Sequence, residues 1–244
     1  ASSLILAAGN EPQKARWLKA IAAGEIVFSV AINESHHFDS STIKTVLSNK
    51  LLTGRKTLVA DAQQADYLLV VCDSGVSAVV ATQADGVSIE QRKLMDGRQF
   101  ATVTFNNVSV ADEDCFATDS QAIDYVVDIG ALAIAAEMIG GARELLERTV
   151  LFLNEREQFD VKIGTFQALQ HRCAQMYCEL ELAASAVLQA FSRLDYGVTD
   201  ISAMASTAKA LSNDCYQLIS NEAVQMHGGM GVTDELDIGL FLKR

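Results

Sequence analysis

The stretch Thr102-Val-Thr-Phe-Asn-Asn-Val-Ser-Val110 largely alternates between polar and apolar residues, and a different pattern follows it from Ser120. Alternation is typical of a strand with one buried face, because successive side chains of a strand point to opposite sides. Between Ser120 and Asn154 the apolar residues recur at steps of three and four, as on one face of a helix. We therefore expect the chain to change from strands to helices near residue 119.

Short apolar segments fill the first half of the chain, and turn-forming residues such as Asp73-Ser-Gly, Asp85-Gly and Asp96-Gly separate them. This pattern predicts an antiparallel β domain, and the lack of intervening long helices disfavours a parallel, Rossmann-type sheet. A short amphipathic helix is expected before the strands, over Glu11–Ala23, with Pro12 in its first turn. The predicted strand segments are Ile26–Ile32, Thr57–Val59, Tyr67–Cys72, Val76–Thr82 and Phe100–Val110.

Three long helices are predicted in the second half, over Ser120–Asn154, Phe166–Leu194 and Ile201–Met226. Asp195-Tyr-Gly and Asp200 serve as stop and start signals between the last two. Helices of this length favour a bundle. The predicted fold class is α+β, with an antiparallel β-barrel or sandwich-like domain over residues 1–118 and an up-down helical bundle domain over residues 119–244.

Composition restricts the possible partners. The formal net charge of −12 makes nucleic acid an unsuitable partner, although a few arginines or backbone N–H groups can still bind an anionic ligand locally. Five scattered cysteines without a CxxC pair predict free thiols in a reducing compartment, and the four histidines have no metal-ligand spacing. With no signal peptide and no apolar run that could span a bilayer, we expect a cytoplasmic protein that binds neither metal nor membrane.

Five segments, in this order, carry a resemblance to a known family. They are Gln13-Lys-Ala-Arg-Trp-Leu with Ala23-Gly-Glu; Leu52-Thr-Gly-Arg-Lys with Ala65-Asp; Phe105-Asn-Asn-Val-Ser-Val; Arg156-Glu-Gln-Phe with Ile163-Gly-Thr-Phe-Gln; and Gln225-Met-His-Gly-Gly-Met-Gly. Together they resemble the acyl-CoA dehydrogenase family across nearly the whole chain, the last two matching its "RxxFGxxIxxFQ" and "QxxGGxG" motifs. The resemblance implies the family's β domain followed by its helical bundle.

The resemblance also implies an FAD site. A guanidinium at Arg156 can pair with the pyrophosphate, and glycines at Gly228 and Gly229 let backbone N–H groups approach it closely. Each residue has a simpler interpretation as well: Arg156 can pair with a carboxylate or interact with a helix C-terminus, and the two glycines can merely end a helix. The residues that the two helical motifs assign to FAD are Arg156, Gln158, Phe159, Phe166, Gln167, Gln225, Gly228 and Gly229.

The β-domain part of the implied site departs from the family pattern. Asn33 stands where the family's "TEPxxGSD" segment begins, and the proline and glycine of that segment are absent. Leu58 replaces a tryptophan that packs on the flavin, and Ala60 replaces a residue whose hydroxyl bonds to it. Flavin is expected to be held less specifically on this side.

The catalytic residues stay unknown. In most members a glutamate acts as the catalytic base and lies in a loop after the "GGxG" motif, which would fall beyond Arg244 here. In a minority this glutamate lies on the first bundle helix, at the position that is Gly130 here. Asp128 and Glu137 lie near it in sequence, but neither is assigned. The family's N-terminal helical domain and last helix are also missing, so we expect either part of a longer protein or a reduced relative.

The function that the resemblance implies is FAD-dependent α,β-dehydrogenation of an acyl-CoA thioester. Expected partners are an electron-transfer flavoprotein and further subunits, in a homo- or hetero-tetramer. Two alternatives stay open: a non-catalytic subunit that supports a heteromeric dehydrogenase, and a flavin monooxygenase or nitroalkane-oxidase relative of the same fold. The sequence does not indicate the length of the acyl chain.

Overall fold

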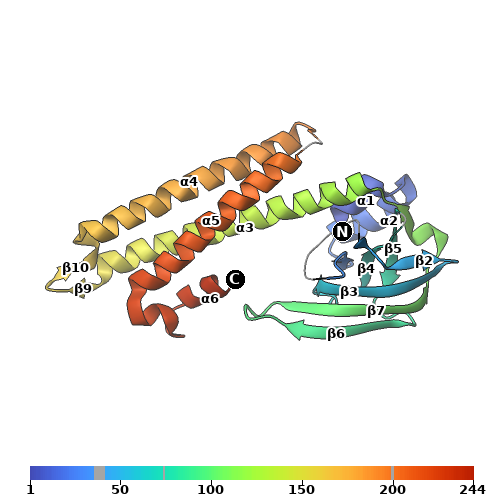
Figure 1. Ribbon diagram of the computed structural model, residues 1–244, viewed down its shortest axis with the longest axis horizontal. Coiled ribbons are helices and arrows are strands. Elements are labelled where there is room, and N and C mark those ends of the chain that lie inside the picture. The colour runs from blue at the N-terminus through green and yellow to red at the C-terminus, as the bar shows by residue number, and fades with distance from the viewer. Residues whose placement is uncertain (36–41, 74, 199–200) are drawn as a thin grey trace. The chain divides into compact units, whose positions relative to one another are not determined.

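The computed structural model describes residues 1–35, 42–73, 75–198 and 201–244. The chain divides into two compact units, Ala1–Val126 and Val127–Arg244, which are described separately (Figure 1). The histidine pair at positions 36–37 with the rest of the run to position 40, the turn residue at 74 and the helix start signal at 200 lie outside the described residues.

Two four-stranded sheets form most of the first unit. One has the order β1 (Phe28–Ala31), β4 (Tyr67–Val71), β5 (Val76–Ala81), β8 (Cys115–Ala117). The other has the order β2 (Val46–Ser48), β3 (Leu51–Ala60), β7 (Gln99–Ser109), β6 (Val87–Lys93). The antiparallel prediction holds for every described pair of these sheets except β1 and β4, which run parallel with Phe28 opposite Tyr67. The predicted antiparallel β domain is thus confirmed, with this pair as an exception that local alternation could not indicate, because alternation does not encode the direction of a distant partner.

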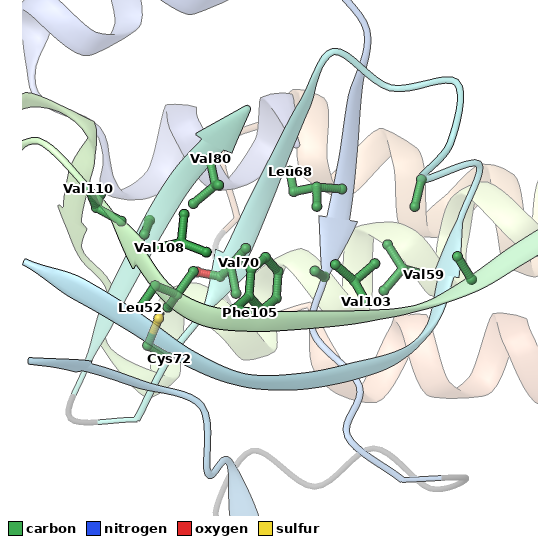
Figure 2. Packing of buried hydrophobic residues seen from close by; sticks show 14 residues of the cluster. Leu52, Val59, Leu68, Val70, Cys72, Val80, Val103, Phe105, Val108 and Val110 are labelled. Atoms are coloured by element: carbon green, nitrogen blue, oxygen red, sulfur yellow. Dashed lines mark hydrogen bonds between the residues drawn. The ribbon is translucent and has the colours of Figure 1, made fainter. Parts of the chain in front are cut away.

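The two sheets pack face to face and enclose a core (Figure 2). Strand β4 shows how the sequence builds it, since alternate residues point to opposite faces. Leu68 and Val70 point to the core between the sheets, where they join Val103 and Phe105 of β7. Leu69 and Val71 point to the opposite face of the sheet and pack with the helices of this unit. The fold of the first unit is thus a β-sandwich.

Helices α1 (Ser2–Ala8) and α2 (Glu11–Ala22) cover the outer face of the β1–β4–β5–β8 sheet. Helix α2 begins with a capping box, in which Asn10 and Gln13 each accept a hydrogen bond from the other's backbone N–H. Trp17 anchors the helix by edge contacts with Phe28 and Tyr67, at 5.3 Å and 5.0 Å between ring centroids. This side of the sheet is therefore buried too.

Helix α3 (Ser120–Glu155) starts in the first unit and continues into the second, where it contacts helices α4 (Gln167–Asp195) and α5 (Ser202–His227) (Figure 1). A small hairpin of β9 (Glu157–Gln158) and β10 (Val161–Lys162) joins α3 to α4, followed by a short turn of helix η3 (Ile163–Thr165). The predicted helical bundle is confirmed, and each of the three long helices ends within two residues of its expected limits.

The buried face of α4 carries Met176, Leu180, Ala183, Val187 and Ala190, at alternating steps of four and three. Helix α5, which packs against α4, buries small residues, among them Ala205 and Ala208. After α5 the chain turns through η4 (Gly228–Val232) and ends in α6 (Ile238–Lys243). None of the described helices has both the length and the apolar character needed to cross a membrane. In the first unit, a short turn of 3-10 helix, η2 (Asp112–Asp114), precedes β8.

Candidate functional site

An open groove of about 600 Å³ lies where α3 and α5 end in the second unit. It brings together residues that are some seventy positions apart in the sequence, including five of the predicted cofactor ligands. Those five are Arg156, Gln158, Gln225, Gly228 and Gly229. The remaining lining residues are Phe152, Ile163, Met226, His227, Met230, Thr233 and Glu235. We call this set the nucleotide groove.

Arg156 follows the last residue of α3, and its backbone N–H donates to the carbonyl of Phe152 at 2.9 Å. Its own carbonyl accepts from Ile163 at 2.9 Å, which ties the base of the β9–β10 hairpin to the helix end. The guanidinium is exposed and forms no ion pair with any carboxylate among the residues that the structure describes. An internal salt bridge of Arg156 therefore has no support among these residues, whereas its place directly after α3 also fits an interaction with the C-terminal end of that helix.

The β9–β10 hairpin closes through Phe159 and Asp160, which have φ values of 59° and 61°. Two central residues with positive φ define a type I′ turn, the tight turn that matches the twist of paired strands. Asp160 stands where the "RxxFG" motif has glycine, so a strained backbone conformation is kept without the residue that adopts it most easily. The turn aims the exposed Phe159 ring at Phe166, 6.2 Å away edge to face.

Helix α5 ends at Gly228, whose φ of 61° reverses the backbone direction. Gly231 is needed for a second reason, since a Cβ there would lie 2.6 Å from the carbonyl oxygen of Val224. Gly229 has open space around the place of its missing Cβ. The glycine run is therefore both a helix end and an approach route for a ligand to the backbone, so the two interpretations of Gly228-Gly229 are compatible.

His227 lines the nucleotide groove but is not among the cofactor ligands predicted from the sequence. Its ring is 6% exposed and stacks on Phe152 at 4.3 Å between centroids. The Nδ1 atom lies 2.7 Å from the carbonyl oxygen of Ala223, one helical turn earlier in α5. The sequence signal was present, since His227 lies inside the quoted motif, but its partners are defined only in three dimensions.

Phe166 and Gln167 mark the start of α4 and do not line the groove. Phe166 occupies the N-cap position and makes no side-chain cap, and Gln167 is exposed at the first helical residue. The structure thus leaves these two predicted ligands outside the groove of a single chain, together with Phe159. Their assignment to FAD stays a prediction.

The first unit has a separate pocket of about 330 Å³, built around Glu34. Its carboxylate accepts hydrogen bonds from the backbone N–H groups of Lys44 and Thr45 at 2.7 Å and 2.9 Å, and from the Thr45 hydroxyl at 2.7 Å. The fourth donor is the ammonium of Lys56, at 2.8 Å. Burial lowers the pKa of Lys56, and the nearby Glu34 carboxylate opposes that shift.

This network explains why the segment Leu52-Thr-Gly-Arg-Lys has its residue types. Leu52 and Lys56 are both fully buried, the first in the sandwich core and the second beneath Glu34. A Cβ on Gly54 would lie 2.5 Å from the Thr45 hydroxyl oxygen, so only glycine at position 54 lets the chain around Thr45 pack on β3. Thr45 and Lys56 bind the Glu34 carboxylate and so hold Asn33–Ser35 against β3, where the remaining predicted flavin contacts lie.

Those contacts are Asn33, Leu58 and Ala60. The carbonyl of Asn33 accepts from the backbone N–H of Thr57 at 2.7 Å, and Leu58 lies in a bulge of β3 with a φ of 51°. Leu58 is 39% exposed and Ala60 is exposed as well. A positive φ at leucine is uncommon and marks a backbone position held by its surroundings. The structure places the three on β3 and on the chain beside it, and their contact with flavin stays a prediction.

No catalytic base emerges in the described part of the chain. Gly130 lies within α3 with no atom within 4 Å of the place of a Cβ, so a side chain would fit there. Glu137 is engaged in an ion pair with Arg244. The described residues contain no group of three His, Cys, Asp or Glu side chains that could hold a metal ion.

Comparison with known proteins identifies the family of the chain. Residues 121–244, slightly more than half of the chain, match the family described as acyl-CoA dehydrogenase, C-terminal domain. The chain belongs to the acyl-CoA dehydrogenase family. Its relatives carry the names of dehydrogenases and reductases, so this is a family of oxidoreductase enzymes.

Two relatives and one solved structure of this family illustrate the range. An acyl-CoA dehydrogenase of Mycolicibacterium smegmatis is 38% identical over 119 residues, 49% of this chain and 36% of the relative. A subunit of the caffeyl-CoA reductase–Etf complex of Acetobacterium woodii is 28% identical over 253 residues, 96% of this chain and 66% of the relative. The fold matches butyryl-CoA dehydrogenase from Megasphaera elsdenii with a TM-score of 0.94 and 21% identity, covering 100% of this chain and 68% of that one. The chain thus spans between about one third and two thirds of these proteins.

Proposed function

We propose that this chain holds the nucleotide part of FAD in its nucleotide groove and serves an acyl-CoA dehydrogenase-type oxidoreductase. The observation that carries the proposal is the convergence in one groove of the Gly228–Gly229 turn and Arg156, which has no carboxylate partner among the described residues. An exposed guanidinium suits a pyrophosphate because it donates two parallel hydrogen bonds to phosphate oxygens. The glycine backbone adds N–H donors without side chains to block them.

The residues present fit such a group. Gln158 and Gln225 line the same groove and can both donate and accept hydrogen bonds, as ribose and adenine require. When bound, FAD would supply the hydride acceptor for oxidation of the acyl-CoA at its α,β bond. The chain's own contribution there is to bind and orient the nucleotide end in the nucleotide groove. In the first unit, Asn33–Ser35, held by the Glu34–Lys56 pair, is a separate predicted flavin contact.

The proposed function also includes an electron acceptor, an oligomeric state and a cellular location. The relative from Acetobacterium woodii is named as part of an Etf complex, which supports an electron-transfer flavoprotein as the electron acceptor here. The exposed Phe159 and Phe166, which lie outside the groove of one chain, support a homo- or hetero-tetramer in which a second subunit completes the site. All five cysteines are free, which supports a reducing, cytoplasmic location.

The test is a flavin measurement on the protein expressed from its full gene. We expect the visible absorbance band of bound flavin in the purified protein, and bleaching of that band by an acyl-CoA without oxygen. Protein that takes up no FAD, alone or with its co-purifying subunits, would contradict the proposal.

A second candidate is a non-catalytic subunit of a heteromeric dehydrogenase, and Gly130 is compatible with it as well as with a dehydrogenase whose base lies in the family's usual loop after the "GGxG" motif. The alternative base position of the family is occupied here by a residue without a side chain. In that case FAD is bound but acyl-CoA does not bleach it until a partner subunit is added. Gly130→Glu, which the open space around Gly130 accommodates, would then be the variant to examine for a gain of bleaching.

A further inference from the structure

His227 has one ring nitrogen engaged within the fold and the other available to a ligand. A carbonyl oxygen can only accept, so the Nδ1 atom 2.7 Å from Ala223 carries the proton and donates it. In the neutral ring the Nε2 atom is then a hydrogen-bond acceptor. No described residue donates to Nε2, although His227 is only 6% exposed and lines the nucleotide groove.

The ring is also fixed in place. Stacking on Phe152 at an interplanar angle of 29° and the bond to Ala223 leave it little rotational freedom. A fixed acceptor with no internal partner binds a donor well, because its orientation costs no further entropy on binding. Leaving such an acceptor unpaired when a ligand covers it costs free energy, so the site can discriminate between ligands.

The position of this acceptor relative to Arg156 indicates which part of a nucleotide it meets. Phe152, on which His227 stacks, lies four residues before Arg156 and accepts the hydrogen bond from the Arg156 backbone N–H. Arg156 and His227 line the same groove, so one ligand can reach both the guanidinium and Nε2. A nucleotide has this arrangement, with phosphates at one end and amine or hydroxyl donors on its nucleoside part.

We infer that His227 is a specificity-determining residue of the nucleotide groove, whose Nε2 atom accepts a hydrogen bond from a donor on the nucleoside part of the ligand. The donor is the exocyclic amine of adenine or a ribose hydroxyl. The inference rests on the proposed function and adds that His227 makes the groove prefer nucleotides that carry this donor. Glu235 lines the same groove, and its carboxylate likewise accepts rather than donates hydrogen bonds.

The experiment measures binding of four nucleotides to the FAD-depleted protein by calorimetry. ADP carries every donor; inosine diphosphate replaces the amine with a carbonyl; 2′-deoxy-ADP and 3′-deoxy-ADP each lack one hydroxyl. We expect one of the three altered nucleotides to bind the native protein about three- to tenfold more weakly than ADP, the effect of one hydrogen bond. The altered nucleotide that shows this loss identifies the donor.

His227→Phe keeps a ring for the stack on Phe152 and removes the acceptor. We expect it to bind ADP and that altered nucleotide equally, with a melting temperature that shows the second unit is folded. If the native protein binds all four nucleotides alike, the inference is wrong even without a variant that folds. Discrimination that persists in a folded His227→Phe protein would also overturn it. Failure of ADP and FAD alike to bind would instead overturn the proposed function, and the inference with it.

Discussion

The ammonium of Lys56 lies 2.8 Å from a carboxylate oxygen of Glu34, and the lysine side chain is completely buried. Three further donors from Lys44 and Thr45 converge on the same carboxylate. A buried ammonium needs such a partner, because leaving one member of a buried pair without its opposite charge is strongly destabilising. The pair joins β3 to the segment that carries Asn33, so it positions the predicted flavin contacts of the sandwich as well as stabilising it.

Glu34→Gln should therefore lower the free energy of unfolding by about 3 kcal/mol, since it leaves the Lys56 charge buried without a counter-charge. Lys56→Met should cost less, because Glu34 keeps its hydrogen bonds from Lys44 and Thr45. The double variant should recover part of the loss. Urea denaturation measures all three. Equal losses in the two single variants and no recovery in the double variant would contradict the assigned role of the pair.

The same carboxylate predicts a dependence of stability on pH. Burial alone would raise the pKa of Glu34, but hydrogen bonds from Lys56, Thr45 and Lys44 outweigh it and hold that pKa below its ordinary value of 4.5. A carboxyl group whose pKa is lower in the folded state contributes stability that is fully present above its unfolded pKa. This contribution is lost as the pH falls below 4.5 through the folded value. Unfolding midpoints measured across that range should fall more steeply for the native protein than for Glu34→Gln.

The sequence predicts the helices of this protein better than its strands, for a physical reason. Apolar periodicity along α3, α4 and α5 is a local property, and the helix ends lie close to the expected positions. Strand β6 was not predicted because its exposed face carries charged residues such as Glu90 and Arg92. Helix α1 was not predicted either, since it is seven residues long and has no side-chain cap. The parallel pairing of β1 with β4 depends on chain topology, which no local pattern contains.

For the candidate site, motif order identified Arg156 and the Gly228–Gly229 turn, and the structure brings them into one groove. The role of His227 could not be predicted, because it depends on a ring from α3 and a carbonyl from α5 that meet only in the fold. The Glu34–Lys56 pair was likewise invisible, since the two residues are 22 positions apart and their neighbours give no pattern.

Two glycines of the same motif should respond differently to substitution. Gly231→Ala places a methyl group 2.6 Å from the Val224 carbonyl oxygen, so the second unit should be destabilised by about 1–3 kcal/mol. Gly229→Ala meets no atom within 4 Å, so the melting temperature should stay unchanged. Its methyl group would instead impede the approach of a phosphate to the backbone, and FAD affinity should fall. Calorimetric melting and FAD titration separate the two effects; a stable Gly231→Ala protein would refute the packing argument.

The turn at Asp160 offers a test of backbone strain. With a φ of 61° this position disfavours residues that have a Cβ, least so for Asp and Asn and more for Ala. Asp160→Gly should therefore be more stable than Asp160→Ala by about 1 kcal/mol in the free energy of unfolding. Asp160→Asn, which tolerates the same conformation, is the matched control and should behave like the native protein. Chemical denaturation that ranks Ala above Gly would show that the turn does not keep this conformation in solution.

The nucleotide groove contains a cation at Arg156 and a carboxylate at Glu235. Removing the cation should weaken the binding of a diphosphate, and removing the carboxylate should strengthen it. Arg156→Ala removes a charge-assisted hydrogen bond worth about 1.5–3 kcal/mol, so FAD should bind about 10- to 100-fold more weakly. Glu235→Gln removes an exposed like charge, and FAD should bind about two- to fivefold more tightly. Arg193→Ala, outside the groove, is the control for net charge and should leave the affinity unchanged. Equal losses in Arg156→Ala and Arg193→Ala, measured by flavin titration, would mean that the groove is not where the phosphates bind.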